Sequence, residues 1–234
     1  MNLFDQLIIW DKQLLLSINS YHLPWLDRFM WLVSETILWS PILLIFLVIL
    51  FRNKGSKTFF ILIAIGLLIL FTDQIASGVI KPLVERFRPT HDPDFGDWVN
   101  VVNGYRGGQY GFISSHAANV FAFAGFSLLL IRNIPYTIVI LLWACLVSFS
   151  RIYLGVHFPL DVICGGLFGF LSAAGMYALY AALFERQPHS RGRNKRSDRK
   201  VTSSDFLKSD VYMLLLALIL LVTTSVIASS KLAW

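Results

Sequence analysis

Six apolar runs, each long enough or nearly long enough to cross a bilayer, constrain this chain more than any other feature. They cover residues 29 to 51, 58 to 80, 115 to 131, 134 to 151, 160 to 184 and 211 to 229. A hydrocarbon core about 30 Å thick needs roughly 20 helical residues to span it, and helices satisfy their own backbone groups there. The sequence therefore predicts an all-α, polytopic membrane bundle of six transmembrane helices, forming one domain over residues 1 to 234.

The distribution of charge predicts which side of the membrane each loop faces. Only 15% of the residues are charged, against about 25% in soluble domains, and the net charge is +6. Lysine and arginine collect at residues 52 to 57, at Arg132 and in the segment 185 to 210. The positive-inside rule places these loops in the cytoplasm. We expect residues 185 to 210 to form a basic cytoplasmic loop and not to bind nucleic acid; binding of RNA or anionic lipid is the less favoured alternative.

The first 20 residues show the periodicity of an amphipathic helix. Its apolar positions are Leu3, Phe4, Leu7, Ile8, Leu14, Leu15 and Ile18. Such a helix is typical of a segment that lies in the membrane interface. The stretch has neither a basic start nor a small-residue cleavage site, so we expect it to be retained in the mature chain.

Cations and hydroxyls gather in the loops that face outward, where membrane anchoring does not require them. Lys81, Arg88 and Arg151 are suited to bind the oxygens of a phosphate monoester. Ser114 and Ser115 stand where a helix begins, so their hydroxyls and the free N–H groups of the first turn can hold the same anion. We therefore predict a phosphate-binding site at the outward surface of the membrane.

Two histidines and one carboxylate supply acid and base groups to this predicted site. His157 and Asp161 are four residues apart, which on a helix would place them one turn apart on one face. The carboxylate can then hold one ring nitrogen as N–H and leave the other free to attack phosphorus. We predict His157 as the nucleophile, Asp161 as its orienting group, and His116 as general acid for the leaving oxygen and then base for water.

The order and spacing of these residues resemble the motifs of the type 2 phosphatidic-acid phosphatase superfamily. Three motifs carry the resemblance: Lys-x6-Arg-Pro at 81 to 89, Ser-x-His at 114 to 116, and Ser-Arg-x5-His-x3-Asp at 150 to 161. The superfamily includes bacterial membrane lipid phosphatases, soluble acid phosphatases and soluble vanadium haloperoxidases. The resemblance covers roughly residues 1 to 184.

The resemblance implies hydrolysis of a phosphoester through a phosphohistidine, with no metal and no cofactor. It assigns phosphate binding to Lys81, Arg88, Ser114 and Arg151. The second motif of the family usually reads Pro-Ser-Gly-His, and this chain has Ile113 and Ser115 in place of the proline and the glycine. Because glycine lets the backbone approach an oxyanion closely and proline favours a helix start, both replacements bear on how the site holds phosphate.

A phosphate site at the membrane edge suits a phosphorylated lipid, whose tail stays among the helices. We expect an envelope lipid as the substrate, with lipid A and undecaprenyl diphosphate favoured over phosphatidylglycerol phosphate and phosphatidic acid. The expected location is the bacterial inner membrane, with the site facing the periplasm. The alternatives are a vanadium-dependent haloperoxidase, which the membrane character disfavours, and a non-catalytic lipid-phosphate binding or transport protein, which the intact histidines and carboxylate disfavour.

Two further carboxylates, Glu35 and Asp73, lie at membrane depth, where ionisable side chains usually pair or line a polar cavity. A structural hydrogen bond is the favoured interpretation, and a role in substrate entry or proton supply is the alternative. The outer loop adds His91, Trp98 and Tyr105, which we expect to help select a headgroup.

Overall fold

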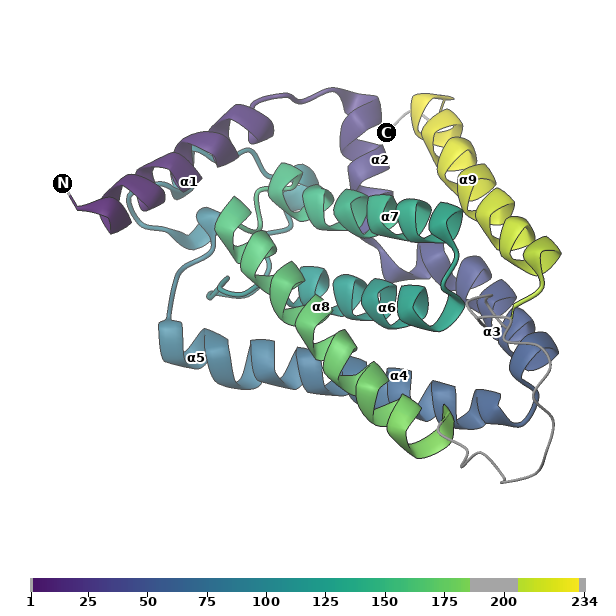
Figure 1. The fold of residues 1–234 in the computed structure, drawn as a ribbon. Helices are drawn as coiled ribbons and strands as arrows, with labels where there is room; N and C mark the ends of the chain where they lie inside the picture. Colours follow the sequence, from purple (N-terminus) through teal and green to yellow (C-terminus); the bar gives the residue numbers. More distant parts are fainter. Residues whose placement is uncertain (1, 186–205, 232–234) are drawn as a thin grey trace, which may run out of the picture.

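The computed structural model describes residues 2 to 185 and 206 to 231, and this part of the chain is built from helices and loops (Figure 1). The α-helices are α1 (Leu3–Asn19), α2 (Pro24–Ser34), α3 (Ser40–Lys54), α4 (Lys57–Gln74), α5 (Lys81–Val84), α6 (Ser115–Ile131), α7 (Ile134–Tyr153), α8 (Pro159–Tyr180) and α9 (Lys208–Lys231). Single 3-10 turns cover Thr36–Trp39, Pro89–His91, Gly96–Trp98 and Val102–Gly104, and π-helical turns cover Ile75–Ile80 and Ala181–Glu185. The fold class predicted from the sequence is therefore confirmed as all-helical.

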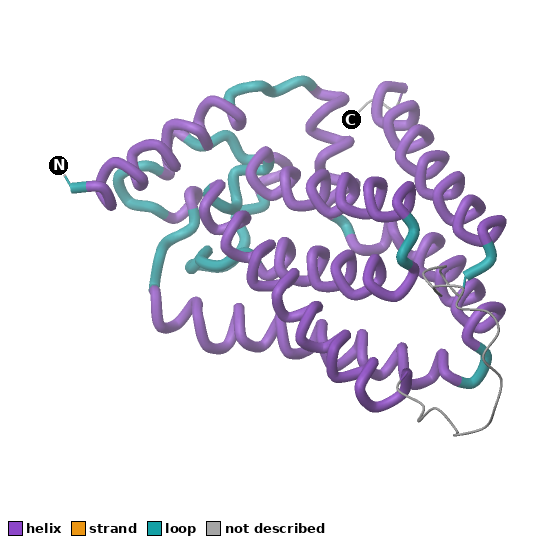
Figure 2. Tube along the Cα trace, in the orientation of Figure 1, coloured by secondary structure: helices purple, strands orange, loops and turns teal. Residues whose placement is uncertain are grey.

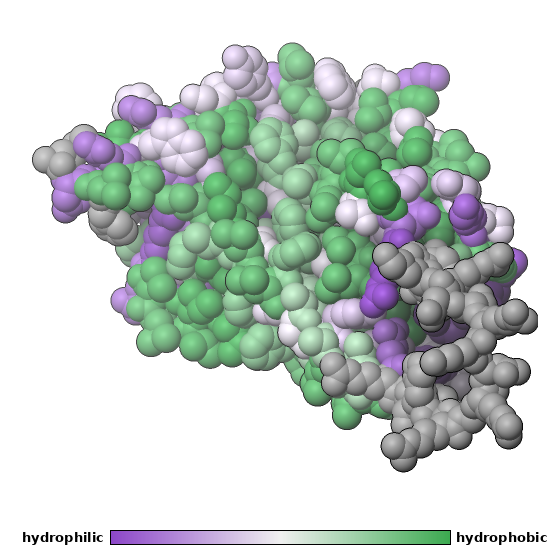
Figure 3. Space-filling view, viewed as in Figure 1, coloured by the Kyte–Doolittle hydropathy of each residue, from purple (hydrophilic) through white to green (hydrophobic). Residues whose placement is uncertain are grey.

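Five helical segments are long and apolar enough to cross a membrane. They are Thr36–Lys54, Lys57–Val84, Ile134–Tyr153, Pro159–Glu185 and Lys208–Lys231. Helix α6 is apolar but shorter, so the count of six transmembrane helices remains a prediction. Figure 3 shows an apolar surface over the middle of the bundle and hydrophilic residues at its two ends. The chain is an integral membrane protein with several spans.

The predicted helix over residues 29 to 51 is wrong, because the chain breaks at Glu35. Helix α2 ends at Ser34, Glu35 has an extended backbone, and a 3-10 turn leads into α3. Pro41 in the first turn of α3 lacks the N–H that would continue a helix from the preceding turn. The indole N–H of Trp39 donates to the carbonyl of Val33 at 3.0 Å, which satisfies a backbone acceptor freed by the break.

Helix α1 forms where it was predicted, but its faces differ from the predicted stripe. Leu15 is buried, whereas Leu3 is 73% exposed. The face that packs against the protein also carries two fully buried polar residues, Asp11 and Asn19. Ile9 is two residues from Asp11 and so on the other side of the helix, and it is 42% exposed. Helix α1 therefore has apolar residues on its outer side as well as its inner one. That composition suits a helix at a membrane interface, which remains a prediction.

Helices α6 and α8 make the closest packing in the bundle, through small residues. A Cβ atom added at Gly169 would lie 2.0 Å from the carbonyl oxygen of Ala118, and one at Gly165 would lie 2.5 Å from that of Ser114. Small residues at four-residue spacing allow such backbone contact between membrane helices. The contact brings the first turn of α6 against the first turn of α8, which are the two turns that carry His116 and Asp161.

The loops with the predicted site residues gather at one end of the bundle. Figure 2 shows the loops between α5 and α6 and between α7 and α8 close to α1, on the left in this view. The connections at residues 55 to 56 and 132 to 133 lie at the other end (Figure 1). Most of the predicted basic loop 185 to 210 falls outside the described residues. The arrangement of the described loops agrees with the alternation predicted from the sequence.

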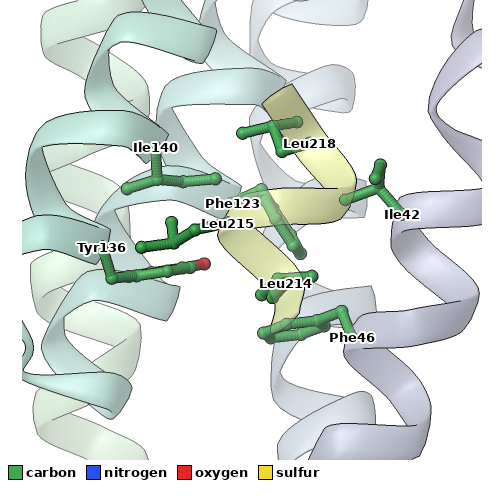
Figure 4. Close-up of a pocket in the computed structure, with 8 residues that line it drawn as sticks. All are labelled: Ile42, Phe46, Phe123, Tyr136, Ile140, Leu214, Leu215 and Leu218. Carbon is green, nitrogen blue, oxygen red and sulfur yellow. The ribbon is translucent and has the colours of Figure 1, made fainter. Parts of the chain in front are cut away.

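A small apolar cavity lies among α3, α6, α7 and α9, well inside the bundle (Figure 4). Its lining residues are Ile42, Phe46, Phe123, Tyr136, Ile140, Leu214, Leu215 and Leu218. None of them is a predicted site residue. The cavity is therefore part of the core that holds α9 against the other helices.

Candidate active site

His157 lies in the tight turn between α7 and α8 and is almost completely buried, at 1% exposure. Its backbone N–H donates to the carbonyl of Arg151 at 3.3 Å. The sequence predicted that His157 and Asp161 share one face of a helix. That prediction is wrong, because helix α8 begins at Pro159 and His157 lies before it. The two side chains still meet, because His157 Nδ1 is 3.6 Å from Asp161 Oδ2.

Asp161 is fully buried in the first turn of α8 and holds that turn in place. Its Oδ2 accepts the backbone N–H of Phe158 at 3.0 Å, which satisfies one of the free donors at the helix start. Its backbone carbonyl accepts the N–H of Ser114 at 2.9 Å. Asp161 therefore connects the turn that carries His157 to the turn that carries Ser114.

Arg88 reaches His157 from the loop between α5 and α6. That loop folds back on itself, with an isolated bridge between Phe87 and Tyr110, so that Arg86 and Arg88 point to the same side. The Nη1 atom of Arg88 is 3.1 Å from His157 Nε2. Burial and the neighbouring Arg151 charge lower the pKa of Arg88.

The second arginine, Arg151, is buried near the end of α7, at 4% exposure. Its Nη1 donates to the hydroxyl of Ser34, at the end of α2. Its guanidinium carbon lies 5.7 Å from the centre of the Tyr105 ring. The buried Nε has no hydrogen-bond partner among the described residues, so this guanidinium has a donor available for an anion.

Lys81 and the two serines form a second group of polar contacts beside the histidine. Lys81 is the first residue of helix α5, one residue beyond the end of the predicted span 58 to 80, and its Nζ donates to Ser115 Oγ at 2.8 Å. Ser115 Oγ is also 2.9 Å from Ser77 Oγ. Ser114 caps α6, since its Oγ accepts the N–H of Ala117 at 3.4 Å. The side chain at the position where the family has glycine is thus hydrogen-bonded to the lysine.

The electrostatic environment of His157 shows which charged groups surround it. Burial, followed by the charge of Arg88, lowers the pKa of the His157 imidazole well below its usual range. Arg151, Lys81 and His116 lower the pKa of His157 further in the same direction. These groups come from three separate segments of the chain, and they act on one imidazole. Asp161 joins them through His157, Ser114 through the Asp161 carbonyl, and Ser115 through Lys81. All eight predicted site residues therefore belong to one cluster.

Two members of this cluster were missed by the sequence analysis. Arg86 donates to Asp161 Oδ1 at 2.7 Å and to Asp11 Oδ2 at 2.5 Å. Asp11 also accepts the N–H of Leu160 at 2.8 Å. An acidic residue on the inward face of a mostly apolar helix was the available signal for Asp11. No pattern in the sequence distinguishes Arg86 from other loop arginines.

The other residues singled out in the sequence are two carboxylates and three ring-bearing residues of the outer loop, and they differ in their contacts. Asp73 Oδ1 accepts from the side-chain amide of Asn119 at 3.4 Å, which is the structural hydrogen bond expected for it. Glu35 is exposed at the break after α2. Among His91, Trp98 and Tyr105, it is Tyr105 that contacts a site residue, Arg151. Within residues 2 to 185 and 206 to 231, no three His, Cys, Asp or Glu side chains group as metal ligands would.

Comparison with known proteins gives the same family as the motifs. The model of the PAP2 superfamily matches residues 59 to 185, more than half of the chain. The chain belongs to the PAP2 superfamily. The relationship predicted from the three motifs is therefore confirmed, and the matched region contains all eight predicted site residues.

Curated relatives place the chain among bacterial membrane lipid phosphatases. It is 42% identical over 171 residues to a lipid A 4'-phosphatase of Porphyromonas gingivalis, covering 73% of this chain and 72% of that protein. It is 41% identical over 161 residues to a lipid A 4'-phosphatase of Bacteroides thetaiotaomicron, covering 68% of this chain and 72% of that protein. The chain is thus a phosphoric ester hydrolase of the PAP2 superfamily that acts on membrane lipids.

Two solved structures share its fold. The transmembrane PAP2 type phosphatidylglycerolphosphate phosphatase from Bacillus subtilis superposes with a TM-score of 0.56 at 24% identity, over 80% of this chain and 90% of that chain. Aquifex aeolicus LpxE superposes with a TM-score of 0.52 at 26% identity, over 71% of this chain and 93% of that chain. The helical bundle is therefore shared with the transmembrane PAP2 type phosphatase and with LpxE.

Proposed function

We propose that this PAP2 phosphatase removes a phosphate from lipid A, most directly the 4'-phosphate, through a phosphohistidine formed on His157. One observation carries the chemical part of this proposal. A buried imidazole has a guanidinium at one ring nitrogen and a carboxylate at the other, with further cations nearby. This is the environment that a nucleophile for a phosphate dianion requires.

The cations account for binding of the phosphate. Arg88 and Arg151 present planar guanidinium groups that match pairs of phosphate oxygens, and Lys81 adds a third positive charge. Arg88 Nη1 now contacts Nε2 of His157 at 3.1 Å. A bound phosphate oxygen is a stronger acceptor than this ring nitrogen, so it takes over the Arg88 donor and leaves Nε2 free for attack.

The hydrolysis then proceeds in two steps on the two histidines. Nε2 of His157 forms a bond to phosphorus while the bond from phosphorus to the lipid oxygen breaks, and His116 gives its proton to that oxygen. A water molecule then attacks the phosphohistidine as His116 takes back a proton. The P–N bond breaks, which releases inorganic phosphate and restores the neutral His157. Asp161 orients the ring and stabilises the positive charge that it gains.

Lipid A is the substrate that the relatives favour. Two relatives of about 42% and 41% identity over most of the chain are lipid A 4'-phosphatases. Weaker matches include a lipid A 1-phosphatase of Rhizobium etli, at 33% identity over 51% of this chain, and the phosphatidylglycerophosphatase B of Bacillus subtilis, at 32% over 45%. The 4'-phosphate therefore ranks first, and phosphatidylglycerol phosphate is the second candidate.

The site belongs at the periplasmic surface of the inner membrane in this proposal. The positive-inside rule supports this orientation, since Arg52, Lys54 and Arg132 lie at the opposite end of the bundle from His157. Six helices cross the membrane if α6 is counted with the five longer spans. Helix α6 packs its whole length against α8, so its shorter span is supported by a neighbouring helix.

A panel of lipid substrates tests the proposal. The purified full-length protein is given lipid A phosphorylated at the 4' or at the 1 position, undecaprenyl diphosphate, phosphatidylglycerol phosphate and phosphatidic acid, each with a chelator present. We expect the fastest release of inorganic phosphate from the 4' position and no loss of activity with the chelator. The rate of phosphate release by His157→Ala should be more than about a thousandfold lower than that of the wild type, as when the nucleophile is removed from other hydrolases.

His22→Ala is the matched control, because His22 is an outer histidine that pairs with Asp27 and not with the site. It should keep the activity of the wild type. Faster turnover of another lipid would replace lipid A as the substrate while leaving the chemistry intact. Activity in His157→Ala equal to that of His22→Ala would remove the proposed mechanism.

A further inference from the structure

Arg86 lies between two buried carboxylates, one of which belongs to the candidate catalytic group. Its Nη1 is 2.7 Å from Asp161 Oδ1, and its Nη2 is 2.5 Å from Asp11 Oδ2. Both carboxylate side chains are 0% exposed, whereas Arg86 is 22% exposed. One guanidinium therefore serves two carboxylates, and its two terminal nitrogens are both occupied.

The plane of the Arg86 guanidinium is fixed by a second contact. Its central carbon lies 4.3 Å from the centre of the Phe158 ring, and Phe158 directly follows His157 in the chain. A planar group stacked on an aromatic ring and forked between two acceptors is a geometry that lysine does not reproduce. Arg86 is thus held as a rigid support and not as a loose surface cation.

Asp11 is fixed as firmly as Arg86. Its Oδ2 pairs with Arg86, and its Oδ1 accepts the backbone N–H of Leu160 at 2.8 Å. Leu160 is in the first turn of α8, next to Asp161. Asp11 therefore uses both oxygens to join α1 to the turn that carries the candidate orienting carboxylate.

The contacts divide the two oxygens of Asp161 between two tasks. Oδ1 accepts from Arg86, and Oδ2 accepts the backbone N–H of Phe158 and faces His157 Nδ1 at 3.6 Å. Both oxygens move together when the carboxylate rotates, so a rotation that moved Oδ2 away from the histidine would also break the Arg86 contact at Oδ1. The position of Oδ2 beside the imidazole thus depends on the contact at Oδ1.

We propose that Arg86 and Asp11 are positioning residues, which hold Asp161 in the orientation that His157 needs during phosphoryl transfer. The proposal rests on the function proposed above. Arg86 fixes Oδ1, and Asp11 shares the Arg86 charge, so Asp161 keeps more of its negative charge for the histidine. The charged groups that face His157 are Asp161, Arg88, Arg151, Lys81 and His116. Asp161 is the one anion among them, so its orientation controls how well the positive ring is stabilised.

Two conservative substitutions test the proposal in the full-length protein. Asp11→Asn keeps the shape and removes one charge, and Arg86→Lys keeps the charge and removes the fork. Each should lower kcat for lipid phosphate by about tenfold or more, with KM changed less than about twofold, because the phosphate-binding cations are untouched. The kcat of the double variant should be no lower than that of the worse single variant, since Asp11 and Arg86 both act through Asp161.

Lys12→Met is the matched control. Lys12 neighbours Asp11 on α1 and pairs with Asp92 of the outer loop at 2.8 Å, so this variant also removes an ion pair that docks α1. That pair does not contact Asp161. We expect Lys12→Met to keep the wild-type kcat, which separates positioning of Asp161 from attachment of α1.

The pH at which activity falls on the acidic side of the pH–rate profile is a second measurement. A purely structural role of Asp11 and Arg86 would leave this acidic limb unchanged. In Asp11→Asn the positive charge of Arg86 is no longer shared, so it draws more of the Asp161 charge away from the imidazole. Protonation of His157 then becomes less favourable, and the limb moves to lower pH. In Arg86→Lys the net charge is unchanged, so the limb stays within a few tenths of a pH unit while kcat falls.

The outcomes separate this proposal from the proposed function. Folded Asp11→Asn protein with wild-type kcat and an unmoved limb would overturn the positioning role. Equal losses of kcat in Lys12→Met and Asp11→Asn would also overturn it, because the effect would then come from docking of α1. His157→Ala in the same assay tests the proposed function itself: if it stays active the mechanism fails, whatever the Asp11 variant does.

Discussion

The two ring nitrogens of His157 meet groups of opposite charge. Nε2 lies 3.1 Å from a guanidinium nitrogen of Arg88, and Nδ1 lies 3.6 Å from a carboxylate oxygen of Asp161. Because a guanidinium only donates hydrogen bonds, Nε2 is the acceptor in this pair and the ring proton belongs on Nδ1. The tautomer that results has its free lone pair on the side where the phosphate-binding cations are, which is the tautomer a nucleophile needs.

The pH dependence of activity follows from the same residue. Burial, and then the Arg88 charge, lower the pKa of His157 below its usual 6.5. A nucleophile must be neutral, so activity is lost only as the pH falls through this lowered pKa. We expect the acidic limb of kcat/KM to lie below pH 6.5. Arg88→Gln removes a neighbouring positive charge, which should move the limb upward towards 6.5.

The substrate phosphate also titrates near pH 6, but its contribution is the same in both proteins, so the difference between their limbs reports the enzyme. Arg106→Gln serves as the control, because Arg106 contacts the carbonyl of Thr90 in the outer loop and not His157. Its limb should match the wild type. A limb that moves downward in Arg88→Gln would contradict the assignment of His157 as the neutral nucleophile.

At the residue scale, the sequence predicted the members of the cluster but not the contacts that hold them. Residue type, spacing and position in the outward loops predicted His116, His157 and Asp161 as site residues, because acid and base groups at a membrane edge have few structural uses. It misplaced His157 on a helix, since periodicity does not reveal that Pro159 starts the helix two residues later. Asp11 was missed because its partner Arg86 is 75 residues away in the chain.

At the scale of single elements, α6 and α8 carry the two halves of the site, and their glycines set how close these halves come. A Cβ atom at Gly169 would lie 2.0 Å from the Ala118 carbonyl oxygen, so Gly169→Ala must push the helices apart. We expect a loss of stability of about 1–3 kcal/mol, as overpacking costs in other cores, and reduced kcat. Thermal unfolding in detergent together with phosphate release measures both effects.

Gly175→Ala on the same helix is the matched control, since nothing lies within 4 Å of the added Cβ atom. It should unfold at the wild-type temperature or slightly above, because alanine is the better helix former. If Gly169→Ala were as stable and as active as Gly175→Ala, close contact of α6 and α8 would not be what joins the halves of the site.

Helix positions were predictable from most of the apolar runs, with the run 29 to 51 as the exception. The run 115 to 131 matches α6 at both ends, because Ser114 caps its start and the chain turns at Arg132. The break at Glu35 was not predicted, since apolar residues continue on both sides of it and hydropathy does not register a local turn. Alternation of the helices predicted correctly which of the described loops share an end of the bundle, because it depends on the order of the spans and not on local helix geometry. The side of the membrane that each end faces stays a prediction from the positive-inside rule.

At the scale of the whole molecule, the fold brings three distant segments to one end of a membrane bundle. The loop after α5 supplies Arg88, the start of α6 supplies His116, and the turn before α8 supplies His157. Helix α1 joins this end through Asp11. A lipid whose tails lie along the apolar surface in Figure 3 would present its phosphate to this end of the protein.

Trapping of the covalent intermediate tests the central claim most directly. Lipid A carrying labelled phosphate at the 4' position is mixed with the protein and quenched in base, in which phosphohistidine is stable. The account predicts a labelled adduct on His157 that is lost in acid and is absent from His157→Ala. In His116→Ala the adduct, once formed, should decay more slowly than in the wild type, because the water step lacks its base. Turnover in the wild type without any adduct, or an adduct that persists in His157→Ala, would contradict it.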